Sequence, residues 1–172
     1  MTGGTGAAGT GQGTTGAVGT NGVTPMKAVA AVMVGLLFFS LLSEVLENTL
    51  VRATASGPLT DMASYFAARN QPGVLAAKAL FTALVAVLAG YVCGKIAGGH
   101  ELTLAGVAAL LQTGAFVYGF TMGEFASQTP IWMRVLLIVI TGPGMIVGAW
   151  VRGQARMAGE QAAQAAHSKE PA

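Results

Sequence analysis

A run of sixteen uncharged residues between Lys78 and Lys95 is the feature that most constrains the fold of this chain. As an α-helix this run is about 24 Å long, at about 1.5 Å per residue. The two lysine side chains can extend along lipid and hold their ammonium groups in water, which lengthens the span to suit a bilayer core of about 30 Å. The stretch Val74–Glu101 is therefore predicted to cross a membrane as a helix.

Small residues occupy every fourth position along one side of this helix: Ala86, Gly90, Gly94 and Gly98. In water each glycine would weaken a helix by about 1 kcal/mol relative to alanine. In lipid a face without large side chains lets a second helix approach closely. We expect this face to pack against another helix, and Gly144 and Gly148, also four residues apart, are the predicted partner face.

The scarcity of charge points to the same class of protein. Charged residues make up 9% of the 172 residues and hydrophobic residues 53%, whereas an ordinary soluble domain has about 25% charged residues. The net charge of +2 and the lack of a basic patch with aromatic residues argue against nucleic acid as a partner. Cys93 is the single cysteine, so it forms no disulfide within the chain.

Three further apolar segments lead us to expect an all-α, integral membrane four-helix bundle between residues 26 and 152. The segment Leu102–Gly123 is uncharged and long enough to span a bilayer unaided. Trp132 and Trp150 are eighteen residues apart, or about 27 Å along a helix, which suits one tryptophan in each interface. The predicted spans cover about 27–47, 75–98, 102–123 and 131–151.

A cleaved signal peptide is the alternative for the first span. Such a peptide has a positive beginning and a small-residue site close behind its apolar core. Lys27 is the only charged residue upstream, and Ser43-Glu44-Val45 is a poor cleavage site. A retained helix is therefore favoured.

The remaining segments are polar or glycine-rich. Residues 1–25 have no charge and are predicted to be a disordered Gly/Thr-rich tail. This tail contains the pattern G-x-G-x-x-G twice, but neither copy follows a strand or opens a helix, so no nucleotide site is predicted. Thr60 can cap a short interfacial helix over 60–69, with an ordinary covering loop as the alternative. Residues 153–172 are predicted to be a polar C-terminal tail.

Four spans place both termini on one side of the membrane. The termini and the loop after the second span carry five basic residues, and the other side carries four. Because basic residues next to spans favour the cytoplasm, both termini are predicted to be cytoplasmic. The two sets are Lys27, Lys95, Arg152, Arg156 and Lys169 on the first side, and Arg52, Arg69, Lys78 and Arg134 on the second.

Glu44 and Glu47 are three residues apart and so share one face near the outer end of the first span. Carboxylates inside a membrane are costly and often mark a proton-coupled or cation-coupled site. The alternative is that they lie at interface depth and pair with Lys78 or Arg134. Both interpretations stay open.

Gln112 lies near the centre of the third span, where its amide needs a partner on another helix or a wet cavity. It can join two helices by a hydrogen bond or line a pathway. In the fourth span, Gly142-Pro143-Gly144 predicts a kink or break, because Pro143 removes one backbone hydrogen bond and two glycines flank it. Broken helices can offer carbonyl groups to an ion, although Gly144 also suits the packing face.

No catalytic constellation is evident in the sequence. His and Cys residues lack the spacing of metal ligands, and no Ser/His/Asp set can be assembled in one compartment. No catalytic residue, metal or cofactor is therefore predicted. The remaining enzymatic alternative is a membrane enzyme acting on lipid-like substrates near Glu124 and Arg134.

The features from Ala89 onward follow a recognisable order. A Gly-Tyr-rich second span ends in a short loop, an Ala/Gly-rich third span follows, and a Pro-x-Trp motif opens a fourth span that ends in Pro and Gly-Ala-Trp. In this order the chain resembles small four-span bacterial inner-membrane proteins of unassigned function. The resemblance implies a plasma (inner) membrane protein of bacterial type, and it carries over no active residue. The matching residues are Gly90-Tyr91, Ile96-Ala97, His100, Gly106, Pro130, Trp132, Pro143 and Gly148-Ala149-Trp150.

Two functions are compatible with these patterns. The first is a non-enzymatic membrane component, accessory or self-associating, that acts through helix packing. Its partners would be the lipid bilayer, a second copy, or a larger membrane complex. The alternative is a small oligomeric transporter or channel that uses Gln112, Glu44 and the break at Pro143.

Overall fold

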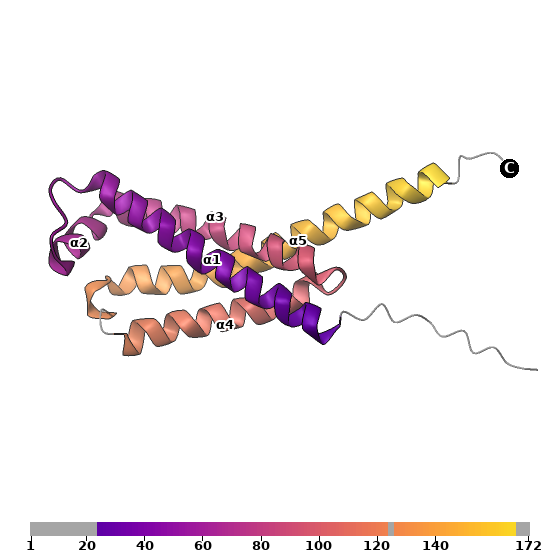
Figure 1. The fold of residues 1–172 in the computed structure, drawn as a ribbon, viewed down its shortest axis with the longest axis horizontal. Helices are drawn as coiled ribbons and strands as arrows, with labels where there is room; N and C mark the ends of the chain where they lie inside the picture. Colours follow the sequence, from indigo (N-terminus) through magenta and orange to yellow (C-terminus); the bar gives the residue numbers. More distant parts are fainter. Residues whose placement is uncertain (1–23, 124–125, 168–172) are drawn as a thin grey trace, which may run out of the picture.

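The computed structural model describes residues 24–123 and 126–167, and every regular element within them is a helix (Figure 1). The predicted tail up to residue 23, Glu124 and Lys169 lie outside the described residues. The elements in chain order are α1 (Pro25–Thr54), α2 (Met62–Arg69), α3 (Pro72–Ala97), α4 (Glu101–Met122), the 3-10 turn η1 (Ala126–Gln128) and α5 (Ile131–His167).

Four of these helices, α1, α3, α4 and α5, are long and apolar enough to cross a membrane. The prediction of an all-helical chain with four helices of spanning length is thus confirmed. They lie side by side, and the short α2 lies at the end where α1 connects to α3 (Figure 1). At the opposite end of the bundle, α1 begins, α3 turns into α4, and α5 leaves the bundle.

Two helices are longer than the predicted spans. α1 continues past residue 47 to Thr54, and α5 continues past residue 151 to His167. The residues after Arg152 are largely Ala, Gln, Glu, Met and Arg, which favour helix even in water. Pro143 lies inside α5 and does not end it. The helix is therefore continuous through Gly142-Pro143-Gly144, and α5 changes direction along its length (Figure 1).

Local sequence signals explain where the other helices begin and end. Pro25 and Pro72 occupy the first helical positions of α1 and α3, where the missing N–H costs little. Asp61, and not Thr60, caps α2, because its carboxylate accepts a hydrogen bond from the Ser64 N–H at 2.7 Å. Gly98 ends α3 with a left-handed backbone (φ +62°), which glycine adopts without steric cost. Gly98 therefore terminates the helix and does not extend its packing face.

The close contact between α3 and α5 holds the middle of the bundle together. A Cβ atom at Gly90 would lie 1.9 Å from the Met145 carbonyl oxygen, and one at Gly148 would lie 1.9 Å from the Val87 carbonyl oxygen. A Cβ at Gly144 would lie 2.8 Å from the Ala86 Cβ. The two backbones can therefore approach this closely only because glycine occupies these positions.

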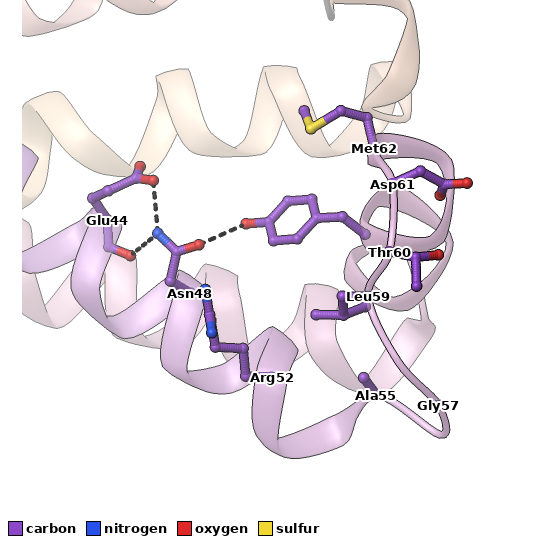
Figure 2. A pocket seen from close by; sticks show the side chains of 10 residues that line it. Glu44, Asn48, Arg52, Ala55, Gly57, Leu59, Thr60, Asp61 and Met62 are labelled. Atoms are coloured by element: carbon purple, nitrogen blue, oxygen red, sulfur yellow. Dashed lines mark hydrogen bonds between the residues drawn. The ribbon is translucent and has the colours of Figure 1, made fainter.

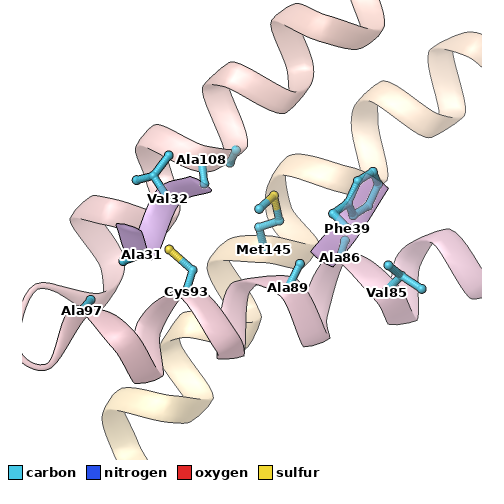
Figure 3. Packing of buried hydrophobic residues seen from close by; sticks show 11 residues of the cluster. Ala31, Val32, Phe39, Val85, Ala86, Ala89, Cys93, Ala97, Ala108 and Met145 are labelled. Atoms are coloured by element: carbon cyan, nitrogen blue, oxygen red, sulfur yellow. The ribbon is translucent and has the colours of Figure 1, made fainter. Parts of the chain in front are cut away.

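The rest of the core is also built from small side chains (Figure 3). Cys93 and Met145 are fully buried between helices, and Phe39 of α1 is the largest side chain in the cluster. Gly94 lies one turn beyond Gly90, where a Cβ would be 3.4 Å from the Ala149 Cα. This half of the bundle is consequently tightly packed. The small members of the cluster are Ala31, Ala86, Ala89, Ala97, Ala108 and Ala109.

Candidate functional site

A cavity of about 270 Å³ lies within the bundle, toward the end that carries α2. Its walls come from α1, α3, α4 and α5, and Arg69 of α2 closes one side. The volume is large enough for several water molecules or one small solute, since a water molecule occupies about 30 Å³ in the liquid. Polar side chains provide much of the lining: Ser40, Ser43, Glu44, Glu47, Arg69, Lys78, Thr82 and Gln112.

The charged groups of this lining form one buried cluster. The Glu47 carboxylate accepts hydrogen bonds from Arg69 Nε on one oxygen and from Lys78 Nζ on the other. The side chains are only 15%, 12% and 8% exposed, respectively. Removing such charges from water is costly unless each is paired and hydrogen-bonded. The cluster joins α1, α2 and α3, and it carries one more positive than negative charge.

The structure decides between the partners proposed for Glu47 from the sequence. Lys78 is its partner, whereas Arg134 donates to the backbone oxygens of Thr129 (2.7 Å) and Phe120 (3.4 Å). The third member, Arg69, was not predicted. Arg69 is the last residue of the short helix α2, next to the turn before α3. Its pairing with Glu47 could be predicted only if the path of residues 55–61 were known.

Arg69 also attaches α2 to the opposite side of the bundle. Its Nη1 donates to Thr129 Oγ1 at 2.8 Å, and its guanidinium lies 5.3 Å from the centre of the Phe66 ring. Next to it, Asn70 Nδ2 donates to the Gln128 carbonyl at 2.6 Å. These contacts bridge from α2 to the segment before α5, so α2 covers this end of the bundle.

A second, more open hollow of about 420 Å³ adjoins the first cavity. Both are lined by Glu44, Glu47, Arg69, Phe116 and Phe120. The Glu47–Arg69 pair therefore lies on the border between an outer hollow and the inner cavity.

Two polar groups of the inner cavity have unused hydrogen-bonding capacity. Gln112 is buried, and no side chain or backbone group in the described part of the chain hydrogen-bonds to its amide. The Ser43 hydroxyl is likewise buried and has no partner among the described residues. Buried polar groups normally find partners, so these two are available to water or to a bound solute.

Glu44 faces a different environment from Glu47. It is exposed, and its carboxylate accepts a hydrogen bond from Asn48 Nδ2 at 2.8 Å, while the Asn48 Oδ1 accepts one from the Tyr65 hydroxyl at 3.4 Å (Figure 2). This row borders a wide surface hollow of about 860 Å³ between α1 and the connection to α2. Burial, and then the nearby charge of Glu47, raise the pKa of Tyr65. Tyr65 therefore stays neutral and acts as a donor.

Pro143 does not belong to the polar cavity. It lines a separate, apolar groove of about 520 Å³ between α4 and α5, together with Gly106, Thr113 and Gly142. The predicted combination of Gln112 with the Pro143 region is therefore not brought together in one site. The glycine face of α3 is also separate, because it lies against α5.

The cavity ends against the packed half of the bundle. A Cβ at Gly35 would lie 3.0 Å from the Cys93 Cβ, and Gly90 approaches Met145 more closely still. The cavity is thus confined to the side of this contact that carries α2. No group of three or more His, Cys, Asp or Glu side chains in residues 24–123 and 126–167 is arranged to hold a metal ion.

Comparison of the chain with protein-family models, with curated proteins and with solved structures found no match.

Proposed function

We propose that this chain is a multi-pass membrane protein that binds a small polar solute or ion in the cavity between Gln112 and the Glu47 cluster, as part of a transport function. The observation that carries this proposal is that the Gln112 amide and the Ser43 hydroxyl line the cavity without a partner among the described residues. Between helices of spanning length, such groups are expensive unless they contact water or a solute.

The arrangement of the charges supports entry from the α2 end. The Glu47–Arg69 ion pair stands between the outer hollow and the inner cavity, and its partners come from different helices. A shift of α2 would move Arg69 and change access to the cavity. Passage to the opposite side would also require α3 and α5 to separate, because Gly90 and Met145 are in close contact.

The location is part of the same proposal. The basic residues at the end where α1 begins favour a cytoplasmic position for both termini, and the resemblance described above favours the inner membrane of a bacterium. The cavity would then open toward the outside. Glu44, at the rim, would be exposed to that side.

Self-association, or membership of a larger membrane complex, needs a surface other than the small-residue face of α3. The Ala86, Gly90 and Gly94 face lies against α5 of the same chain. On α4, by contrast, nothing lies within 4 Å of a Cβ at Gly106 or Gly114. The mass of the complex that the full chain forms in mild detergent shows whether it assembles. This measurement accompanies the flux experiment below.

A flux assay in liposomes that contain the full chain tests the transport proposal. The probes are protons, sodium, potassium, chloride and glycerol. Replacing Gln112 by Leu removes the cavity amide and should lower the flux of the transported probe by about tenfold, the effect of about 1.4 kcal/mol. The neighbouring substitution Thr113→Val is the matched control, because Thr113 faces the apolar groove.

Equal flux through liposomes with and without the protein, for all five probes, would contradict the transport proposal. Equal effects of Gln112→Leu and Thr113→Val would contradict the assignment of the cavity as the binding site. Circular dichroism of each variant in detergent verifies that the helices are intact.

A further inference from the structure

Four cations lie around the turn from α3 to α4, at the end of the bundle away from the cavity. Lys95 belongs to the last turn of α3, and a Cβ at Gly98 would lie 3.7 Å from Lys27 Nζ of α1. Gly98 caps α3 and Gly94 lies in its last turn, so Lys27 and Arg152 contact the same end of this helix. The cations are Lys27, Lys95, Arg152 and Arg156.

The side chain of Arg152 is fixed against the glycine face of α3. A Cβ at Gly94 would lie 3.4 Å from both Cβ and Cγ of Arg152. The absence of a side chain at Gly94 thus lets the alkyl part of Arg152 pack on the α3 backbone. The guanidinium is held at the surface of the bundle and does not extend freely into solvent.

The carboxylates in this region are both engaged by Arg156. Arg156 Nε lies 2.8 Å from Glu101 Oε1, and Arg156 Nη1 donates to Glu160 Oε1 at 3.2 Å. Within the described ranges, Lys27, Lys95 and Arg152 have no carboxylate partner. Four positive and two negative groups leave two positive charges in excess, offset in part by the α3 C-terminus, about half a negative charge.

Arg152 provides a second observation that points to a ligand. Its Nε is buried and donates to no acceptor in the part of the chain that the structure describes. A buried, charged donor without an acceptor is costly. The planar guanidinium matches the geometry of phosphate oxygens better than a lysine ammonium does. The Arg152 side chain as a whole is partly exposed, so an anionic oxygen at its guanidinium would balance the excess charge.

We propose that this end of the bundle binds the phosphate of an anionic lipid headgroup, with Arg152 and Lys27 as the main contacts and Lys95 at the rim. A lipid fits better than free phosphate because apolar side chains next to Arg152 are exposed: Val147, Trp150 and Val151. Acyl chains can cover these while the headgroup meets the cations. The site depends on insertion into a membrane and is independent of solute binding in the cavity.

Competition between lipids tests this site. The full chain in neutral detergent is offered dioleoylphosphatidylglycerol and dioleoylphosphatidylcholine in equal amounts, and the retained lipid is measured by native mass spectrometry. The wild type should retain the anionic lipid in preference. Arg152→Gln and Lys27→Gln should each weaken this retention by about fivefold, the factor for about 1 kcal/mol per basic residue at an anionic surface.

Arg52→Gln is the matched control, because Arg52 is exposed at the other end of α1 and has no ion pair among the described residues. It should leave retention unchanged. Lys27 is also exposed, so Lys27→Gln remains informative if Arg152→Gln misfolds. Equal retention of the two lipids by the wild type would contradict the proposed site. The same would follow if Arg52→Gln weakened retention of the anionic lipid as much as Arg152→Gln and Lys27→Gln do. If excess inorganic phosphate displaced the lipid, the site would be a site for free phosphate and the proposal of a lipid headgroup would be wrong.

Discussion

At the scale of single residues, Gly90 sets how closely α3 and α5 approach. A Cβ there would lie 1.9 Å from the Met145 carbonyl oxygen, which is part of a helix backbone and cannot rotate away. Gly90→Ala must therefore push the two helices apart. We expect a loss of about 3 kcal/mol in the free energy of unfolding, the upper part of the range for overpacking, measured by denaturation of the full chain in detergent.

Gly114→Ala provides the comparison for this substitution. Gly114 lies in α4, and nothing is within 4 Å of its added Cβ. Alanine is the better helix former by about 1 kcal/mol, so this variant should be as stable as the wild type or slightly more so. If Gly90→Ala and Gly114→Ala have the same stability, the close α3–α5 contact does not exist in the protein.

Residue spacing predicted the glycine contacts between α3 and α5, but it did not predict the pairing of Glu47 with Arg69. The four-residue interval placed Gly90, Gly144 and Gly148 on helix faces, because a helix repeats nearly every four residues. Gly98 has the same interval but ends α3, since the chain turns immediately after it. Arg69 could not be assigned to Glu47 because that pairing depends on how the connection between α1 and α2 folds back.

At the scale of elements, α2 depends on the cap at its first turn. The Asp61 carboxylate accepts the Ser64 N–H at 2.7 Å, and the Ser64 hydroxyl accepts the Asp61 N–H at 3.3 Å. The hydrogen bond from the Ser64 backbone holds the pKa of Asp61 below its ordinary value of 3.8. Because the folded-state pKa is lowered, the stabilisation is complete above the unfolded pKa and is lost as pH falls through the folded pKa.

Hydrogen exchange of the amides of α2 can detect this loss. The amides of Met62–Arg69 should become less protected as the pH is lowered from about 7 to about 3, below the usual aspartate pKa, after correction for the intrinsic pH dependence of exchange. In Asp61→Ala the protection should be lower at neutral pH and should change less with pH. Ser64→Ala keeps the carboxylate and should keep the pH dependence. An unaltered pH profile in Asp61→Ala contradicts this role.

The lengths of the elements show what hydropathy can and cannot predict. The pattern of apolar residues located four long helices, because apolar runs of this length are uncommon outside spanning helices. It placed the end of the last span near Arg152, where polarity rises, whereas α5 continues to His167. The helix continues because Ala, Gln, Glu and Arg favour helix without an apolar environment.

At the scale of the whole molecule, the fold class follows from the sequence but the cavity does not. Composition and the length of the apolar runs are properties of the chain alone. The cavity depends on which faces of α1, α3, α4 and α5 are turned inward, and so on the close α3–α5 contact. Gln112 was identified as an unusual polar residue in the sequence, yet only the folded chain places it near Lys78 and Glu47.

The direction from which a solute enters depends on the orientation of the bundle. The cavity lies toward the α2 end of the bundle. The helix α1 begins at the other end, where α5 also leaves the bundle (Figure 1). Four spanning helices and the distribution of basic residues predict cytoplasmic termini and an external α2. Two introduced cysteines test this orientation in a Cys93→Ala background: Gly57→Cys next to α2, where the added side chain has open space, and Ala162→Cys in the exposed part of α5.

A membrane-impermeant maleimide should label Gly57→Cys in intact cells and Ala162→Cys only after lysis. The chain with its native Cys93 should remain unlabelled in both conditions, because that thiol is fully buried. Labelling in the reverse order would show that the cavity faces the cytoplasm. Labelling of both cysteines from the same side would contradict four spans, since an odd number of crossings separates residue 57 from residue 162. External labelling of Gly57→Cys would place the Glu47–Arg69 pair on the side from which solute arrives, with the basic end at the inner leaflet, where anionic lipids are concentrated.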